Sequence, residues 1–196
     1  MNSVNICFLI LNYNSYKDTI SFVQHILNQE SIIQLLPILI VDNCSTDHSY
    51  ETLLKIFDKN QIVDVIQTKY NGGYGYGNNW GIKHLQQFYN PELIIISNPD
   101  ITVDVAIIPE MAKAFQVDKN IAAVSAQMVN SNNKHQLSAW RLPNLFDDII
   151  LSVGLLKAIF NNPVEYLLTL KPRYVDVLQG AFFMIKSKAM DEIDGY

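Results

Sequence analysis

The chain alternates between short, continuous hydrophobic runs and longer segments with hydrophobic residues at helical spacing. Val4 to Leu11 is apolar apart from Asn5, as expected for a strand that is covered on both faces. The segment after this run has the spacing of a helix with one buried face. Its hydrophobic positions are Tyr16, Ile20, Val23 and Leu27.

The same alternation repeats through the first hundred residues. Hydrophobic runs and helical patterns predict further strands at Pro37–Val41, Ile62–Gln67 and Leu93–Ser97, and helices at Tyr50–Phe57 and Asn78–Tyr89. This strand–helix order predicts an α/β fold with a mostly parallel central sheet, flanked by helices and joined by right-handed crossovers.

The pattern is less regular after Asp100. Pro109 fits the first turn of a helix, and short strands are expected at 121–125, 136–140, 175–177 and 181–185. Between residues 145 and 160, 11 of 16 residues are apolar without a polar face. A helix of this kind is typical of a buried element or a membrane surface, and we favour burial. We expect a single domain over residues 1–196.

Composition excludes several classes of protein. The chain has 196 residues, of which 49% are hydrophobic and 17% charged, with a net charge of -5. These values disfavour a disordered chain and a polybasic nucleic-acid binder. Cys7 and Cys44 form neither a disulfide framework nor a zinc motif. Because we find no signal peptide and no apolar stretch of about 18 residues, we expect a cytoplasmic protein.

Two polar segments carry the sharpest chemical signal. Asn71 to Asn79 follows the third strand and contains four glycines in six residues. We expect a helix starting near Asn78 to direct its free N–H groups towards a ligand from this loop, although glycines also mark ordinary turns. Asn98-Pro99-Asp100 ends the fourth strand on a carboxylate, where open α/β sheets bind ligands. The alternative interpretation of this segment is an ordinary turn that ends the strand.

The loops after the first two strands should lie at the same edge of the sheet. Tyr13, between Asn12 and Asn14, offers a ring for base stacking, and Asp42 could accept hydrogen bonds from a base or ribose. A surface turn and a helix cap are the alternatives. Ser15 and Asp18 resemble a capping box. Asp100 suits Mg²⁺ or Mn²⁺, which are typically held by one or two carboxylates together with phosphate oxygens.

Taken together, these segments resemble family 2 glycosyltransferases of the GT-A fold, particularly a bacterial subgroup that includes rhamnosyltransferase-like enzymes. The matching segments are Leu9–Asn14, Val41–Asp47, Asn71–Ile82, Asn98–Asp100 and Gln179–Ile185. The resemblance implies that Asp42 contacts the base, Asn98 lies near the ribose and Asp100 binds the metal. The implied nucleotide-sugar-binding residues are Asn12, Tyr13, Asn14, Asp42, Asn43, Asn71, Gly72, Tyr74, Gly75, Asn78, Asn98, Asp100, Gly180 and Ala181.

The resemblance also implies a reaction. A sugar would move from a nucleoside-diphosphate donor to a glycan or lipid-linked acceptor in polysaccharide biosynthesis, with inversion and with Mg²⁺ or Mn²⁺. Residues 1–100 would form the nucleotide-binding half and residues 101–196 part of the acceptor side. The lipid-linked acceptor adds a peripheral association with the inner face of the membrane to the expected cytoplasmic location.

The catalytic base has no match in the sequence and is expected beyond Tyr196. The alternative hypothesis is therefore a non-catalytic fragment that only binds a nucleotide sugar. A nucleotidyltransferase and a Rossmann dehydrogenase are disfavoured, because their glycine-rich loop should follow the first strand. Asn12-Tyr13-Asn14-Ser15 stands there instead.

Overall fold

The computed structural model describes residues 4–29, 36–132, 134–136, 138–140, 142, 173–193 and 195. The helix predicted at 145–160 lies outside the described residues. Internal contacts divide the chain into two compact units, one formed by Met1–Val124 with Gly180–Tyr196 and the other by Ser125–Gln179. The single domain expected from the sequence, with a nucleotide-binding half at 1–100 and part of the acceptor side at 101–196, stays a prediction.

The main sheet has six strands in the order β3-β2-β1-β4-β8-β5. Strands β1 to β4 pair in parallel, and β8 is antiparallel to β4. The strand bounds are Ile6–Asn12 (β1), Ile38–Asp42 (β2), Val63–Gln67 (β3), Leu93–Ser97 (β4), Ala123–Ser125 (β5) and Phe182–Lys186 (β8). The predicted mostly parallel sheet is confirmed.

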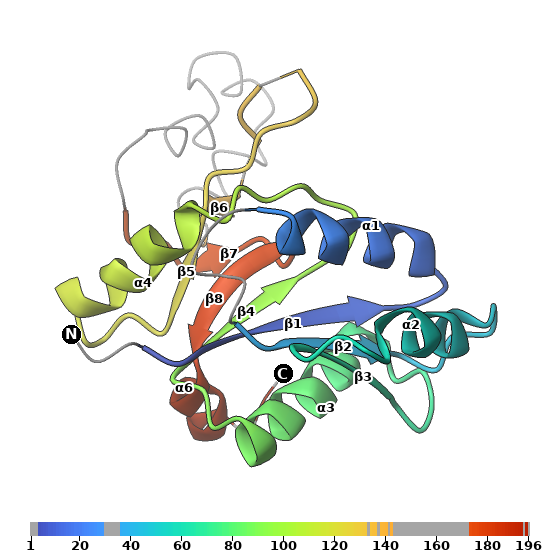
Figure 1. Cartoon of the computed structure of the whole chain (residues 1–196). Helices are drawn as coiled ribbons and strands as arrows, with labels where there is room; N and C mark the ends of the chain where they lie inside the picture. Colours follow the sequence, from blue (N-terminus) through green and yellow to red (C-terminus); the bar gives the residue numbers. More distant parts are fainter. Residues whose placement is uncertain are drawn as a thin grey trace, which may run out of the picture. The chain divides into compact units, whose positions relative to one another are not determined.

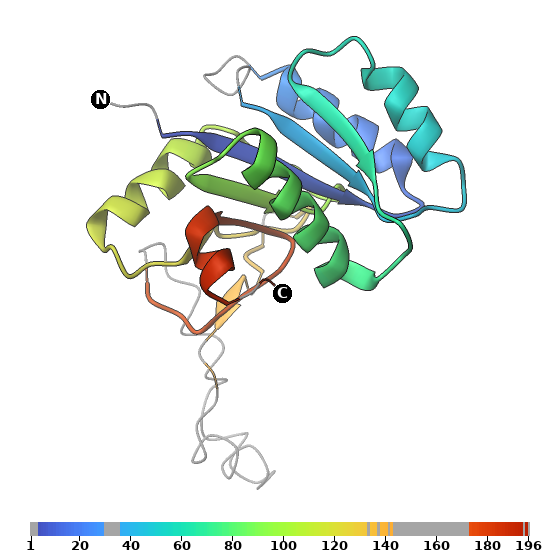
Figure 2. The same cartoon turned by 90° about the horizontal axis from the view of Figure 1, so that it is seen from below.

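Helices cover both faces of this sheet. Figure 1 shows α1 and α4 on one side and α3 and α6 on the other, and Figure 2 shows α3 and α6 from below. The helix bounds are Tyr16–Leu27 (α1), Ser49–Phe57 (α2), Gly73–Phe88 (α3), Ile107–Val117 (α4) and Ser187–Glu192 (α6). Every residue of β2 and β4 is buried, which explains their uninterrupted apolar sequences.

The strand order reverses next to β1. The chain runs outward from β1 to β2 and β3, then returns to place β4 on the other side of β1. Parallel pairing brings the carboxyl ends of β1 and β4 side by side, with Ile10 opposite Ser97. Ligands of open α/β sheets bind outside the carboxyl ends of strands at such a switch point.

Helix α3 begins at Gly73, and the predicted start near Asn78 was wrong. Glycine is a weak helix former, so the sequence favoured a loop here. Two of these glycines instead allow close packing on the sheet. A Cβ atom at Gly81 would overlap Leu9 and lie 2.8 Å from Cγ2 of Val41, and one at Gly77 would overlap Leu11.

The capping box expected at the start of α1 is also absent. Ser15 is the N-cap residue of α1, but its side chain makes no capping hydrogen bond. Its hydroxyl donates instead to Oδ1 of Asn12 at 3.2 Å. Asn12 is fully buried, and a buried amide needs partners, so the Ser15 hydroxyl is engaged there.

The second unit contains a two-stranded antiparallel sheet. It pairs β6 (Ala139–Trp140) with β7 (Val177–Leu178), and both overlap or adjoin the predicted strands. Val129 and His135 form an isolated bridge.

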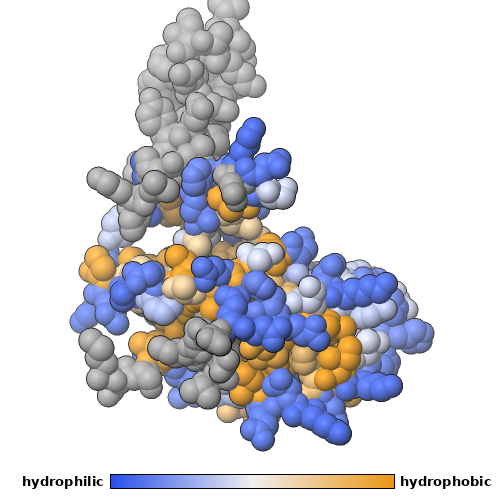
Figure 3. Space-filling model, turned by 45° about the horizontal axis from the view of Figure 1, so that its top comes forward, coloured by the Kyte–Doolittle hydropathy of each residue, from blue (hydrophilic) through white to orange (hydrophobic). Residues whose placement is uncertain are grey.

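Among the described helices of the chain, none has the length and apolar character needed to span a membrane. Hydrophobic side chains on the face drawn in Figure 3 are bordered by hydrophilic ones.

We expect Gly81→Ala to lower the free energy of unfolding by about 1–3 kcal/mol, the usual effect of overpacking. The added methyl group would press on Leu9 and Val41, and urea unfolding measures the loss. Gln87→Ala, at an exposed position of the same helix, is the control and should change stability by less than about 0.5 kcal/mol. Equal stability of the two variants would show that α3 moves away from the sheet without cost.

Candidate functional site

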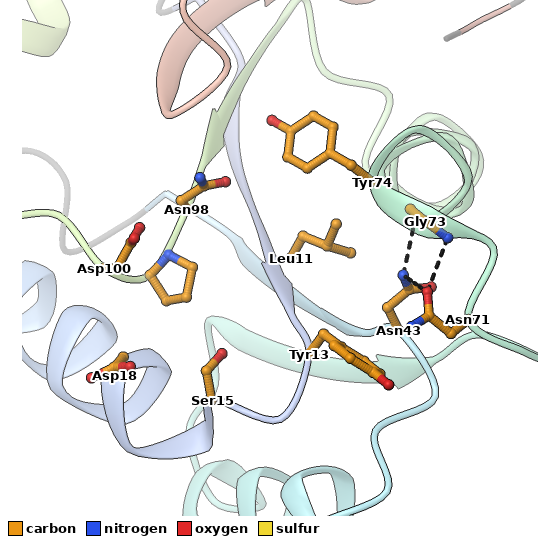
Figure 4. Close-up of a pocket in the computed structure, with 11 residues that line it drawn as sticks. Leu11, Tyr13, Ser15, Asp18, Asn43, Asn71, Gly73, Tyr74, Asn98 and Asp100 are labelled. Carbon is orange, nitrogen blue, oxygen red and sulfur yellow. Dashed lines mark hydrogen bonds between the residues drawn. The ribbon is translucent and has the colours of Figure 1, made fainter.

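A cleft of about 500 Å³ opens at the carboxyl ends of β1 and β4. Figure 4 shows Asn98 and Asp100 at the end of β4 on one side, with Asn43, Asn71 and Gly73 across from them. The lining residues are Leu11, Tyr13, Ser15, Asp18, Asn43, Asn71, Gly73, Tyr74, Asn98, Pro99 and Asp100. The cleft therefore lies at the switch point of the sheet, where the strand order predicts a ligand.

The structure brings six of the predicted binding residues together on the cleft wall. These are Tyr13, Asn43, Asn71, Tyr74, Asn98 and Asp100. The other predicted residues do not line the cleft: Asn12, Asn14, Asp42, Gly72, Gly75, Asn78, Gly180 and Ala181. Most residues of this second group are sequence neighbours of lining residues, namely Asn12, Asn14, Asp42, Gly72 and Gly75.

Asp42 and Asn12 form a buried hydrogen-bond network below the cleft. Both side chains are 0% exposed. The Asp42 carboxylate accepts from Asn12 Nδ2 at 2.8 Å, from the backbone N–H and hydroxyl of Ser45 at 2.9 and 2.6 Å, and from Gln67 Nε2 at 3.1 Å. A base could reach Asp42 only by displacing one of these donors. In this structure Asp42 holds together the ends of three strands, and its contact with a base stays a prediction.

Asn43, the residue after Asp42, does reach the cleft. Its Nδ2 donates to Oδ1 of Asn71 at 2.9 Å and to the carbonyl of Gly73 at 3.1 Å. The backbone N–H of Gly73 also donates to Oδ1 of Asn71 at 3.0 Å. Gly73 has a φ of +83°, which glycine adopts without steric cost. These bonds fix the start of α3 against the end of β2, so the cleft wall on this side is preformed.

The loops after β1 and β2 are also joined to each other. Oδ1 of Asn14 accepts the backbone N–H of Thr46 at 2.8 Å, and the backbone N–H of Asn14 donates to the hydroxyl of Ser45 at 2.9 Å. Asn14 and Cys44 both have positive φ, at 51° and 57°. Non-glycine residues in this region cluster at functional sites, and here one lies in each of the two loops.

The charges of the cleft are all negative. Asp18, on the first turn of α1, and Asp100 line it together, and the described lining residues include no lysine, arginine or histidine. Within the described part of the chain, no three or more His, Cys, Asp or Glu side chains gather to hold a metal ion by themselves. The carboxylates of Asp18 and Asp100 are the acidic groups on the cleft wall that a cation could contact.

Tyr74 connects the cleft to the segment before β8. Its hydroxyl donates to the carbonyl of Gly180 at 2.6 Å, and burial raises the pKa of this phenol. The backbone N–H of Asn98 donates to the carbonyl of Ala181 at 2.9 Å. Gly180 and Ala181 thus lie between Tyr74 and Asn98, next to the cleft but outside its lining.

Five lining residues were missed as site residues from sequence: Leu11, Ser15, Asp18, Gly73 and Pro99. Gly73 and Pro99 stood inside segments that we had singled out. Asp18 carried a signal, since an acidic residue follows the first loop by one helical turn, but it was interpreted as part of a cap. Once the Ser15 hydroxyl is known to contact Asn12, the carboxylate of Asp18 is better explained by its place on the cleft wall.

Residues 7–193 match the family model described as Glycosyl transferase family 2. The chain belongs to glycosyl transferase family 2. A similar protein is the low-salt glycan biosynthesis hexosyltransferase Agl10 of Haloferax volcanii, with 25% identity over 192 residues. The match covers 98% of this chain and 55% of Agl10. The chain therefore spans about half the length of this curated relative.

Two solved structures share the fold of this family 2 chain. Mannosyltransferase PcManGT from Pyrobaculum calidifontis, in complex with GDP-Man and Mn²⁺, has a TM-score of 0.61 at 15% identity and is covered to 47%. S. aureus TarS 1-349 in complex with UDP-GlcNAc has a TM-score of 0.59 at 18% identity and is covered to 48%. These matches cover 98% and 97% of this chain. The expected GT-A fold is confirmed.

Asp42→Asn should lower the free energy of unfolding by about 2 kcal/mol or more, because hydrogen bonds to a charged group are worth about 1.5–3 kcal/mol each. The new amide would also turn N–H groups towards the donors that now surround Asp42. Urea unfolding measures this loss.

Asp58→Asn, at the exposed end of α2, is the matched control for Asp42→Asn. It should change stability by less than about 0.5 kcal/mol. An Asp42→Asn protein of normal stability that no longer binds nucleotide would contradict the structural role and favour direct contact with a base.

Proposed function

We propose that this chain forms the nucleotide-sugar-binding part of a glycosyltransferase. The enzyme would move a sugar from a nucleoside diphosphate to a glycan or lipid-linked acceptor, with inversion and with a divalent metal ion. The relatives support the class: Agl10 is named a hexosyltransferase, and PcManGT and TarS were solved with GDP-Man and UDP-GlcNAc. A lipid-linked acceptor would bring the protein to the cytoplasmic face of a membrane.

The observation that carries the proposal is the cleft at the switch point with Asp100 on its wall. A diphosphate brings at least two negative charges into a cleft lined by the carboxylates of Asp18 and Asp100. Because the described lining residues include no cationic side chain, repulsion would oppose binding. A divalent cation between the carboxylates and the phosphates would offset this repulsion.

The residues present fit Mg²⁺ or Mn²⁺. Both ions prefer oxygen ligands, and Mg²⁺ sites commonly use one or two carboxylates plus substrate phosphates. Asp100 is the first candidate ligand, and Asp18 lies on the same cleft wall. When bound, such an ion neutralises the charge that develops on a departing diphosphate. The absence of a complete metal-binding cluster among the described residues agrees with an ion that binds together with its nucleotide.

The chain's own residues would place the nucleotide along the cleft. The exposed ring of Tyr13 is available to stack on the base, and Asn71, held by Asn43, lines the same cleft. Asn98 precedes the metal-binding Asp100 and would lie near the ribose. Asn12 and Asp42 would act from below, by holding the loops that carry these groups.

The alternative is a chain that binds a nucleotide sugar without transferring it. One observation favours this alternative. Asp18 and Asp100 are the only acids among the described cleft-lining residues. Both would lie beside the cation, which leaves no further acid among these residues to act as the catalytic base. An inverting transfer also needs a base for the acceptor hydroxyl, typically worth 10²–10⁴-fold in rate. Transfer of sugar by this chain above the rate of donor hydrolysis would exclude the alternative.

Calorimetric titration of UDP, GDP and dTDP, with Mn²⁺ or Mg²⁺ and then with EDTA, tests the nucleotide site. We expect one nucleotide to bind in the presence of metal and EDTA to abolish the binding. Asp100→Asn should weaken metal-dependent binding by at least about 10-fold, since even outer-shell partners of a metal typically contribute that much.

Asp58→Asn is the control for Asp100→Asn and should bind like the unchanged protein, because Asp58 lies at the end of α2 outside the cleft. Binding that survives EDTA would contradict the role of the metal. Unchanged affinity in the folded Asp100→Asn protein would remove Asp100 from the site.

A further inference from the structure

We propose that Tyr74 is a positioning residue, whose hydroxyl holds the Gly180–Ala181 segment against Asn98 and thereby fixes the metal-binding end of the cleft. The hydroxyl reaches Gly180 across 106 residues of sequence, with a donor–acceptor distance of 2.6 Å. This distance lies in the usual range for O–H···O hydrogen bonds. The role for Asp100 rests on the proposed function, whereas the contact itself does not.

The backbone of Tyr74 is held in place at the start of α3. Tyr74 lies in the first turn of α3, whose glycines at 77 and 81 bring the helix against β1 and β2. Asn78, which is 0% exposed, donates its Nδ2 to the backbone carbonyl of Tyr74 at 3.0 Å. Because the helix start is held from two sides, the phenol ring extends from a rigid point.

The contact continues to the cleft through two backbone groups. Gly180 precedes Ala181, whose carbonyl accepts the N–H of Asn98 at 2.9 Å. This bond extends the antiparallel pairing in which Ser97 lies opposite Phe182. Figure 4 shows the Tyr74 ring directed towards the side of the cleft on which Asn98 lies. A hydroxyl on α3 therefore acts on the residue that leads into Asp100.

Gly180 lies directly against the phenol of Tyr74. A Cβ atom at position 180 would lie 3.5 Å from the Tyr74 oxygen and 3.7 Å from its ring carbon Cζ, which are ordinary van der Waals distances. The pair therefore combines a hydrogen bond with close packing.

Hydrogen exchange measured by NMR tests the contact without any ligand. Tyr74→Phe removes only the hydroxyl, and we expect exchange of the Asn98 amide to rise about threefold to tenfold, the range that a hydrogen bond of typical net strength gives. The amide of Ile40, in the centre of β2, should keep its exchange rate. Equal acceleration at both amides would indicate general destabilisation and overturn the positioning role.

Tyr76→Phe is the matched control, because Tyr76 lies on the same helix and stacks on Tyr70 with ring centroids 4.5 Å apart. We expect this variant to leave Asn98 exchange unchanged. If Tyr74→Phe also leaves it unchanged in a folded protein, the proposal fails.

Titration of Mn²⁺ with the nucleotide that binds best among UDP, GDP and dTDP gives the functional readout. Tyr74→Phe should weaken binding about threefold to tenfold, and Tyr76→Phe should not. If the unchanged protein binds none of these nucleotides, the proposed function fails while the exchange experiment still decides the contact. Faster Asn98 exchange with unchanged affinity would overturn the link to the metal-binding end.

Discussion

The arrangement of the cleft depends on the buried carboxylate of Asp42. A charge without solvent contact is costly unless it is fully hydrogen-bonded, and Asp42 meets this condition with donors from Asn12, Ser45 and Gln67. Asn12, Asp42 and Gln67 stand opposite one another at the ends of β1, β2 and β3. The loops that leave these strands therefore start from fixed points, and Tyr13 and Asn43 reach the cleft from there.

Much of the fold could be predicted from the sequence, because the strands are buried on both faces. Runs such as Ile94 to Ile96 have no polar interruption, so their limits are visible without a structure. The start of α3 could not be predicted in the same way. Gly77 opposes a helix by its intrinsic preference, and only the contact of α3 with β1 and β2 favours it. That contact joins residues far apart in the chain.

The candidate site could be predicted only in part, because it too depends on contacts between residues far apart in the chain. The sequence identified the loops that meet at the switch point, but not which side chain in each loop faces the cleft. Asp42 and Asn43 are neighbours in sequence, yet Asp42 is enclosed by donors while Asn43 lines the cleft. Asp18 was not identified as a site residue, because Ser15 and Asp18 were interpreted as a capping box. That interpretation needs the Ser15 hydroxyl, which contacts Asn12 instead.

The glycine packing of α3 has a mechanical consequence. With no side chains at 77 and 81, the helix axis lies too close to the sheet to slide or rotate without overlap. This helix forms one wall of the cleft, carries Tyr74 and is bonded at Gly73 to Asn43 and Asn71. A ligand entering this cleft meets a wall that is already packed on the sheet, so binding loses little entropy in ordering that wall.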